Sequence, residues 1–201
     1  MKKLVVILWI SLIFIGIGWV FWDQEMKYHL PTPTPKHYKS VKIGSKLDLS
    51  ETLPNQEGKP TFIHFFNPSC PCSRFNVPHV RSLIKAYGNK ISFAIVVISN
   101  DKEYTTQDIQ EKFDTDIPIF FDSDLAKKCG VYSTPQAVII NQNQQLYYRG
   151  NYNKSRYCTN KRTNYAQLAI ESMLKNDANP LFSTYALKSY GCELPIICGK
   201  S

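Results

Sequence analysis

The segment Thr61–Pro78, TFIHFFNPSCPCSRFNVP, constrains the fold of this chain more than any other part of it. It begins with Thr61–Phe66, a run rich in aromatic and β-branched residues that predicts a buried strand. A short break leads to Cys70 and Cys72, and the pattern after them predicts a helix over Arg74–Ala86. A cysteine at a strand-to-helix turn lies where the helix amides and dipole favour its thiolate. The segment therefore predicts a reactive thiol.

This segment resembles the active-site motif of the thioredoxin-like superfamily. In that superfamily a strand ending in Phe-Trp leads to Cys-x-x-Cys, with a buried acid before the first cysteine and a helix proline after it. Without any gap, Phe65-Phe66 takes the place of Phe-Trp and Cys70 that of the first cysteine. Pro78 takes the place of the helix proline, and His64 stands where the buried acid would be.

A second hallmark of the superfamily, a cis-proline that faces the cysteine, is matched by Gly130–Pro135, GVYSTP, with the predicted strand Ala137–Ile140 after it. The two motifs together, in a match over Val41–Leu174, predict an α/β domain with a thioredoxin-like mixed central sheet flanked by helices. The resemblance implies that Thr134 and Pro135 present backbone to a substrate segment and keep metal ions off the thiols.

The sequence departs from the superfamily at the second cysteine, where Ser73 stands in the same register and Cys72 lies one place earlier. The site is therefore either a Cys-x-Cys dithiol or a Cys-x-x-Ser site with an extra thiol. A disulfide from Cys70 to Cys72 would close a small, strained ring, and strained disulfides are easily reduced. Such a dithiol would tend to be a good oxidant or isomerase.

The N-terminus predicts a membrane anchor. Residues 1–3 form a short basic tip, and Leu4–Trp22 is long and apolar enough for one transmembrane helix. A cleaved signal peptide is the alternative, but the aromatic residues at the end of this stretch favour an uncleaved interfacial anchor. Lys2 and Lys3 keep the tip cytoplasmic. We therefore expect a single-pass protein of the inner (cell) membrane, with everything after Asp23 on the extracytoplasmic or periplasmic side.

The remaining chain divides into three predicted parts. Residues 23–37 form a Pro-rich linker, and its LPTPTP stretch favours an extended spacer that lifts a domain from the bilayer. Residues 38–175 form the thioredoxin-like domain. Residues 176–201 form an extension with two cysteines and a predicted short helix, and the superfamily offers no role for it.

Hydrophobic patterning predicts the other elements of the domain. The expected strands are Val41–Gly44, Lys46–Leu49, Ile91–Ile98, Ile117–Phe121 and Gln145–Arg149, and the expected helices are Thr105–Phe113, Leu125–Cys129 and Ala166–Leu174. Asn141–Gln144 predicts a hairpin turn. The long βαβα unit before Pro135 resembles the redoxin or TlpA-like branch, whose members are often membrane-anchored outside the cytoplasm.

Four further cysteines are compatible with disulfides outside the cytoplasm, and spacing alone cannot choose among their pairings. Cys129 lies on a predicted apolar helix face, which favours a buried, unreactive thiol over a resolving thiol for Cys70. Cys158 lies in a polar loop, which makes a structural bridge to Cys192 or Cys198 attractive.

The basic net charge of +8 does not indicate nucleic-acid binding. The positive residues are spread out, and no nucleic-acid-binding module is recognisable. The densest cluster favours a solvated loop or affinity for anionic lipid heads; its members are Lys154, Arg156, Lys161 and Arg162.

These features predict a thiol-disulfide oxidoreductase that acts on protein cysteines, without a cofactor. Cys70 would form the mixed disulfide and Cys72 would resolve it. His64 would move protons to or from the leaving sulfur, or would be a neutral histidine packed in the sheet. The expected partners are protein thiol or disulfide substrates and a redox partner protein.

Three other functions stay open. Cys70 and Cys72 could bind Cu(I) in a metallochaperone, although His79 is too far along the helix to share the site. A thiol peroxidase is less favoured, because Phe65 stands where peroxiredoxins have a proline. The domain could also be a scaffold that only docks a partner.

Overall fold

The computed structural model describes residues 2–49, 52–53, 58–99, 104–177 and 181–195. Within these ranges, five strands form the central sheet in the order β3-β2-β1-β5-β6. The strands β1, β2 and β3 run parallel, whereas β5 is antiparallel to β1 and β6 to β5. The predicted mixed sheet is therefore confirmed. Its strands are β1 (Thr61–Phe66), β2 (Ser92–Val97), β3 (Ile119–Phe120), β5 (Gln136–Ile140) and β6 (Leu146–Gly150).

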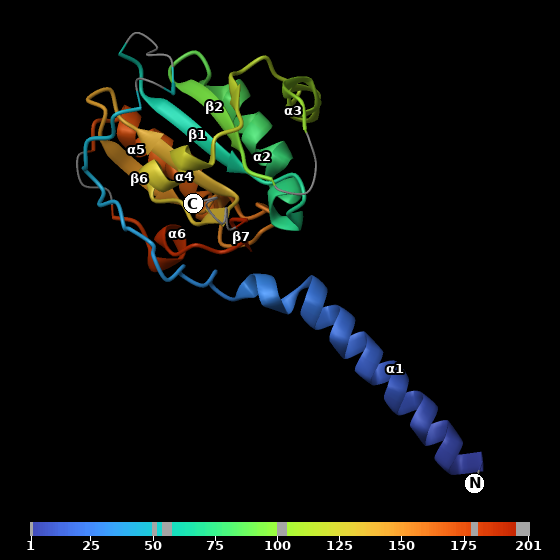
Figure 1. The fold of residues 1–201 in the computed structure, drawn as a ribbon. Coiled ribbons are helices and arrows are strands. Elements are labelled where there is room, and N and C mark those ends of the chain that lie inside the picture. The colour runs from blue at the N-terminus through green and yellow to red at the C-terminus, as the bar shows by residue number, and fades with distance from the viewer. Residues whose placement is uncertain (1, 50–51, 54–57, 100–103, 178–180, 196–201) are drawn as a thin grey trace.

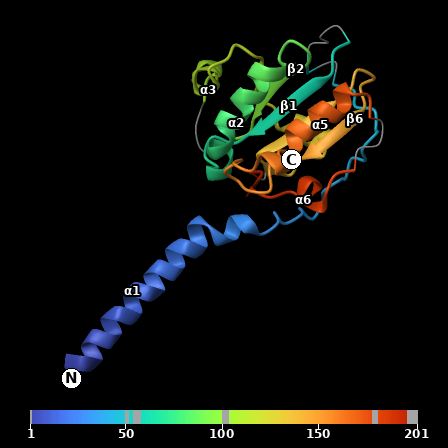
Figure 2. The same cartoon turned by 180° about the vertical axis from the view of Figure 1, so that it is seen from behind.

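Helices cover both faces of this sheet (Figures 1 and 2). One face packs against α2 (Pro71–Tyr87), α3 (Thr106–Phe113) and α5 (Tyr165–Leu174). The other face packs against α4 (Ser123–Cys129) and the two leucines of the segment before β1. The predicted flanking helices are thus present, each within a few residues of its expected bounds.

Strand β1 is buried on both faces, which explains why its sequence is apolar without alternation. Phe62 and Phe66 point into the α2 side of the sheet, whereas Ile63 and Phe65 point into the α4 side. All four of these side chains are fully buried. Because β1 lies between β2 and β5, its carboxyl end opens next to the start of β5, where Pro135 lies.

The two predicted strands before β1 are not present. Within the described part of this segment, one isolated bridge joins Lys46 to Gln145. Leu47 and Leu49 are nevertheless buried against the α4 side of the sheet. The alternating pattern therefore reflects leucines that pack under α4, and not a strand with paired neighbours.

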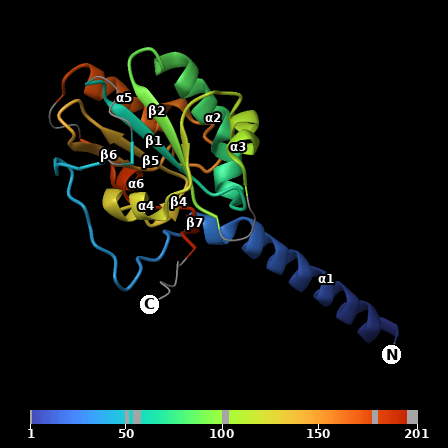
Figure 3. The ribbon, with the colours of Figure 1, turned by 45° about the horizontal axis from the view of Figure 1, so that its top comes forward.

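The C-terminal segment returns to the domain. The strand β7 (Cys192–Glu193) pairs antiparallel with β4 (Ser133–Thr134), and Cys192 lies opposite Thr134. Figure 3 shows β7 beside β4 at the edge where the N-terminal segment also arrives. The predicted helix over 181–190 is shorter than expected, because α6 spans only Thr184–Leu187. Residues 196–201, which include Cys198, lie outside the described residues.

The N-terminal helix α1 (Lys2–Gln24) projects away from the domain (Figure 1). It has no buried residue, and together with the 3-10 turn η1 (Met26–His29) it is long and apolar enough to cross a membrane. A segment without regular secondary structure connects it to the domain, in agreement with its proline content.

Helix α3 begins with a capping box that the sequence predicted in part. The Thr105 hydroxyl accepts a hydrogen bond from the amide of Asp108, whose carboxylate accepts one from the Thr105 amide. We expect Thr105→Ala to lower the free energy of unfolding by about 1 kcal/mol, because one helix amide loses its acceptor. Urea unfolding of the full chain in detergent, followed by circular dichroism, measures this. The neighbouring Thr106→Ala is the control, and an equal loss in both variants would contradict the capping role.

Candidate functional site

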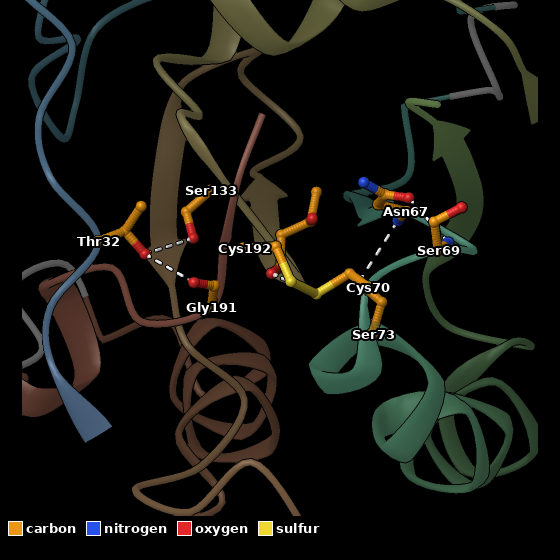
Figure 4. The surroundings of a disulfide bond; sticks show 9 residues. Thr32, Asn67, Ser69, Cys70, Ser73, Ser133, Gly191 and Cys192 are labelled. Carbon is orange, nitrogen blue, oxygen red and sulfur yellow. Dashed lines mark hydrogen bonds between the residues drawn. A yellow bond between two sulfur atoms is a disulfide. The ribbon is translucent and has the colours of Figure 1, made fainter. Parts of the chain in front are cut away.

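A disulfide joins the start of α2 to the C-terminal segment. Cys70 is the N-cap residue of α2, and its sulfur is bonded to that of Cys192 in β7, with 6.0 Å between the Cα atoms (Figure 4). Of the two partners expected for Cys158, Cys192 is therefore wrong, and Cys198 lies outside the described residues. Cys72 is not bonded to Cys70 here, and Cys72, Cys129 and Cys158 are thiols.

The predicted cis-proline faces this disulfide. The Thr134–Pro135 peptide bond is cis, and the Cys70 sulfur lies 3.5 Å from the carbonyl oxygen of Thr134. Gly191 permits this approach, because a Cβ there would lie 2.2 Å from the same oxygen. Its φ of +147° is also one that other residues rarely adopt. The glycine before Cys192 thus lets the tail lie directly against the cis-proline turn.

The segment after the apolar helix closes one side of the site. The Thr32 hydroxyl lies 2.9 Å from the Ser133 hydroxyl and donates to the Gly191 carbonyl at 3.3 Å (Figure 4). The Thr32 amide donates to the carbonyl of Ser189 at 2.9 Å. Thr32 is only 5% exposed. The linker therefore packs onto the domain beside the disulfide at Thr32.

A polar turn positions Cys70 at the other side. The Asn67 side chain accepts a hydrogen bond from the Ser69 amide at 2.9 Å, and the Ser73 hydroxyl accepts one from the Asn67 amide at 3.4 Å (Figure 4). Ser73, at the place of the superfamily's second cysteine, is fully buried. Its hydroxyl therefore contacts the turn before Cys70 and not the disulfide partner.

A cavity of about 130 Å³ lies behind the disulfide, between α2, the loop after β6 and the segment after α1. Cys72, Pro135, Tyr152, Arg156 and Cys158 all contribute to its wall. Cys72 is 3% exposed, and burial raises the pKa of its thiol while the Arg156 guanidinium acts in the opposite direction. The cavity therefore brings Cys158 close to Cys72. From the sequence, Cys158 was expected only to lie in a polar loop.

His64 lies behind the cavity and is a buried neutral histidine. Burial lowers the pKa of its imidazole to about 3, with a smaller contribution from the charge of His79. Its Nδ1 lies 2.7 Å from the Tyr152 hydroxyl. Because Tyr152 lines the cavity, its hydroxyl is the polar group between His64 and the space beside the cysteines.

The structure also bears on Cys129 and on the Cu(I) site that the sequence left open. Cys129 is fully buried on α4, and burial raises the pKa of its thiol to about 12, which agrees with an unreactive core cysteine. Among the described residues, no cluster of three or more His, Cys, Asp or Glu side chains could hold a metal ion. In this oxidised state Cys70 offers no thiolate to the Cu(I) site that the sequence left open.

Sequence reasoning missed Cys192, Tyr152, Arg156 and Cys158 as residues of the site. Residues 191–199, GCELPIICG, suggested a stapled loop, but nothing in that pattern pointed to Cys70.

A family description matches residues 40–193, which is most of the chain: a domain of unknown function, DUF6436. The chain belongs to the DUF6436 family. The matched range begins before β1 and ends at Glu193, so it includes both Cys70 and Cys192.

One named relative is similar to part of this DUF6436 chain. It is 27% identical over 105 residues to the thiol-disulfide oxidoreductase ResA of Halalkalibacterium halodurans. That match covers 51% of this chain and 57% of the relative, so the chain spans little more than half of the relative's length. Together with the sheet order and the cis-proline, it confirms the predicted thioredoxin-like relationship.

Two solved structures share the fold over most of the DUF6436 chain. A hypothetical protein from Sinorhizobium meliloti has a TM-score of 0.65 at 17% identity and covers 80% of this chain and 98% of its own. An uncharacterised conserved protein from Geobacillus kaustophilus has a TM-score of 0.60 at 18% identity and covers 81% of this chain and 97% of its own. At these identities the likeness shows the fold alone.

The burial of His64 predicts a pH dependence of stability. Its folded pKa of about 3 lies below the ordinary value of 6.5, so between these values the unfolded chain binds a proton that the folded chain does not. Stability should therefore fall on acidification below pH 6.5, by up to about 1.4 kcal/mol per pH unit from this group.

His64→Asn, which keeps a polar atom near Tyr152, should lose that part of the slope in urea unfolding between pH 6.5 and pH 4.5. His79, whose pKa burial also lowers, is present in both proteins and contributes to the slope that remains. An NMR titration of His64 with a midpoint above pH 5 would show that the ring is not buried as described.

Proposed function

We propose that this protein exchanges thiols and disulfides with cysteines of other proteins through the Cys70–Cys192 disulfide. One observation carries the proposal: a disulfide sulfur at the N-terminus of a helix lies 3.5 Å from the backbone of a cis-proline turn. A helix N-terminus stabilises the thiolate that exchange releases, which makes the sulfur there a good leaving group and nucleophile. The ResA relative is itself named a thiol-disulfide oxidoreductase, which supports the assignment.

The exchange uses two thiolate attacks. A substrate thiolate attacks one sulfur of the Cys70–Cys192 bond, which breaks, and the other sulfur leaves as a thiolate and takes a proton. A second substrate thiolate then attacks the mixed disulfide, so the substrate is oxidised and both protein cysteines are reduced. The reverse sequence reduces a substrate disulfide. Two electrons move in each direction, and no cofactor is needed.

Backbone and proton-transfer groups complete the proposal. Thr134 and Pro135, at the edge beside Cys70, would present their backbone to the substrate segment. β7 occupies the pairing edge of β4, so a substrate strand must compete with or extend this small sheet. His64 would assist only through the Tyr152 hydroxyl, because it is fully enclosed.

We assign Cys192 as the partner that resolves a mixed disulfide on Cys70. The sequence assigned this role to Cys72, which is two residues away. The existing bond from Cys70 supports Cys192, because the two sulfurs already have bonding geometry. Cys72 then needs another role.

The proposal places the domain outside the cytoplasm on a single membrane-spanning helix, α1, in the inner (cell) membrane. The length and apolar composition of α1 support an anchor, and Lys2 and Lys3 at its start favour a cytoplasmic tip. An extracytoplasmic domain would meet the oxidising conditions in which disulfides persist. A second protein would return the Cys70–Cys192 pair to its starting redox state.

The experiment is mixed-disulfide trapping with the full chain in detergent. The reduced protein is mixed with a peptide that contains one disulfide, quenched by acid and alkylation, and mapped by mass spectrometry. We expect Cys192→Ser in a Cys72→Ser background to accumulate a Cys70–peptide disulfide and to lose turnover by roughly 100-fold or more, because neither thiol that could attack Cys70 remains, whereas Cys72→Ser alone should retain turnover. Cys70→Ser should form no adduct at the active site.

Cys129→Ala is the matched control, since it removes a fully buried thiol on the opposite face of the sheet and should retain turnover. Accumulation in Cys72→Ser, with normal turnover in Cys192→Ser, would show that Cys72 resolves the adduct and that our assignment of Cys192 is wrong. If wild-type protein neither forms an adduct nor exchanges with the peptide, the proposed function is wrong.

A further inference from the structure

Two thiols that the proposed exchange does not use share the cavity behind the disulfide. Cys72 lies in the first turn of α2, and Cys158 lies in the loop after β6. The Cys158 thiol donates a hydrogen bond to Oδ1 of Asn76 at 3.0 Å. Asn76 lies four residues after Cys72, so both side chains project from the same face of α2. Cys72 and the hydrogen-bond partner of Cys158 therefore lie about one turn apart on α2, at the wall of the same cavity.

Arg156 lies beside these thiols and has buried N–H groups without a hydrogen-bond acceptor among the described residues. Nη2 of Arg156 donates to the Glu25 carboxylate at 2.6 Å and to the Tyr157 hydroxyl at 2.9 Å. Its Nε and Nη1 are buried, and among the described residues they have no hydrogen-bond partner. A buried charged donor without an acceptor is costly. A thiolate on Cys72, in the same cavity, is an anion to which these two N–H groups could donate.

Arg156 is held firmly enough to act at a fixed place. Its guanidinium carbon lies 4.9 Å from the ring centre of Tyr28, 5.0 Å from that of Tyr157 and 5.3 Å from that of Phe75. The Tyr157 hydroxyl also donates to Glu25 at 2.7 Å. The aromatic rings and the carboxylate fix the planar group from several sides.

We propose that Cys72 and Cys158 form a second redox dithiol, which exchanges within the chain with the Cys70–Cys192 disulfide. This inference rests on the proposed function of that disulfide. The structure then represents one of two isomers, each with one disulfide and one pair of thiols. The second isomer carries a Cys72–Cys158 bond in the cavity and free thiols at the substrate-facing site.

The internal transfer balances without an external oxidant. The Cys72 thiolate attacks the Cys70 sulfur, the Cys70–Cys192 bond breaks, and Cys192 leaves and takes the proton that Cys72 lost. The Cys158 thiolate then attacks Cys72, the Cys70–Cys72 bond breaks, and Cys70 leaves at the helix N-terminus and takes the proton from Cys158. A bond across one intervening residue is strained, which suits a transient intermediate.

Acid-base chemistry assigns the two thiols different roles. Arg156 opposes the effect of burial on the pKa of Cys72, so Cys72 is the better nucleophile for the first attack. Burial, and the nearby charge of Cys72, raise the pKa of Cys158 to about 12. The Cys72 charge disappears once that sulfur is bonded to Cys70. The second attack should still be the slower one, and its rate should rise with pH.

The first test asks whether the second pair forms when the first is absent. The full chain with Cys70→Ser and Cys192→Ser is equilibrated in glutathione buffers, alkylated and mapped by mass spectrometry. We expect a reversible Cys72–Cys158 disulfide, while Cys129 stays a thiol as an internal control. Persistent Cys72 and Cys158 thiols in fully oxidised glutathione, or a bond from Cys72 to any other cysteine, would overturn the proposal. Circular dichroism confirms that the variant is folded.

The second test uses wild-type protein and so does not depend on a variant that folds. Protein with the single Cys70–Cys192 disulfide is incubated anaerobically without thiol reagents, at pH 7 and at pH 9, and quenched over time. We expect the Cys72–Cys158 isomer to appear, faster at pH 9, and Cys158→Ser to yield only the Cys70–Cys72 intermediate. Disulfides confined to Cys70–Cys192 at both pH values would overturn the transfer.

Arg156 is a positioning residue in this scheme, and the pH profile of Cys72 alkylation by iodoacetamide tests it. Arg156→Gln should move the profile to higher pH, and Arg156→Lys should restore part of the shift, because both cations stabilise a thiolate. Arg162→Gln, which removes an exposed charge from the same basic loop, should leave the profile unchanged. Equal profiles in wild type and Arg156→Gln would contradict the role.

The two proposals fail separately. A variant with Cys72→Ser and Cys158→Ser retains the Cys70–Cys192 pair and should still form and resolve the peptide adduct. If it does while no Cys72–Cys158 bond is found in the first test, the second dithiol is wrong and the proposed function stands. If it does not exchange with the peptide, the proposed function is wrong.

Discussion

The bond between Cys70 and Cys192 is the constraint on which the arrangement of the site depends. It closes a loop of 122 residues and fixes the C-terminal segment against the cis-proline turn, with β7 paired to β4. Constraining the unfolded chain over a loop of this length contributes on the order of 5 kcal/mol while the bond is intact. Reduction removes that contribution, and the β7–β4 pairing and the hydrogen bonds from Thr32 to Ser189 and Gly191 then hold the tail. In the proposed function, exchange at this bond would therefore alter the edge to which a substrate segment binds.

The segment that follows α1 belongs to the same arrangement. Thr32 bonds to the β4 turn and to Gly191, while Glu25 holds Arg156 at the cavity wall. Arg156 is 12% exposed, so its ion pair with Glu25 is shielded more than a surface pair. The segment that follows the apolar helix thus contacts residues beside the Cys70–Cys192 disulfide and beside the cavity that holds Cys72 and Cys158. This segment, which was expected to act as a spacer, thus packs onto the domain beside the disulfide and the cavity.

The sequence predicted the parts of the fold that depend on local pattern. The buried strand before Cys70, the helix after it and the proline turn at Pro135 are short motifs, and sheet pairing brings them together. Cys192 and Cys158 could not be predicted as site residues, because their positions depend on tertiary contacts across 122 and 82 residues. The alternating leucines before β1 suggested a strand. An extended segment that buries every second side chain shows the same apolar–polar alternation whether or not its backbone pairs with another strand.

Disulfide mapping of the full chain isolated without reductant, after alkylation at acid pH, tests the central claim most directly. The account predicts a linked peptide that joins Cys70 to Cys192, with Cys129 alkylated as a thiol. A stable bond from Cys70 to Cys72, or one from Cys192 to Cys158, in place of that peptide would contradict the account. Either result would mean that the tail does not complete the site at the start of α2.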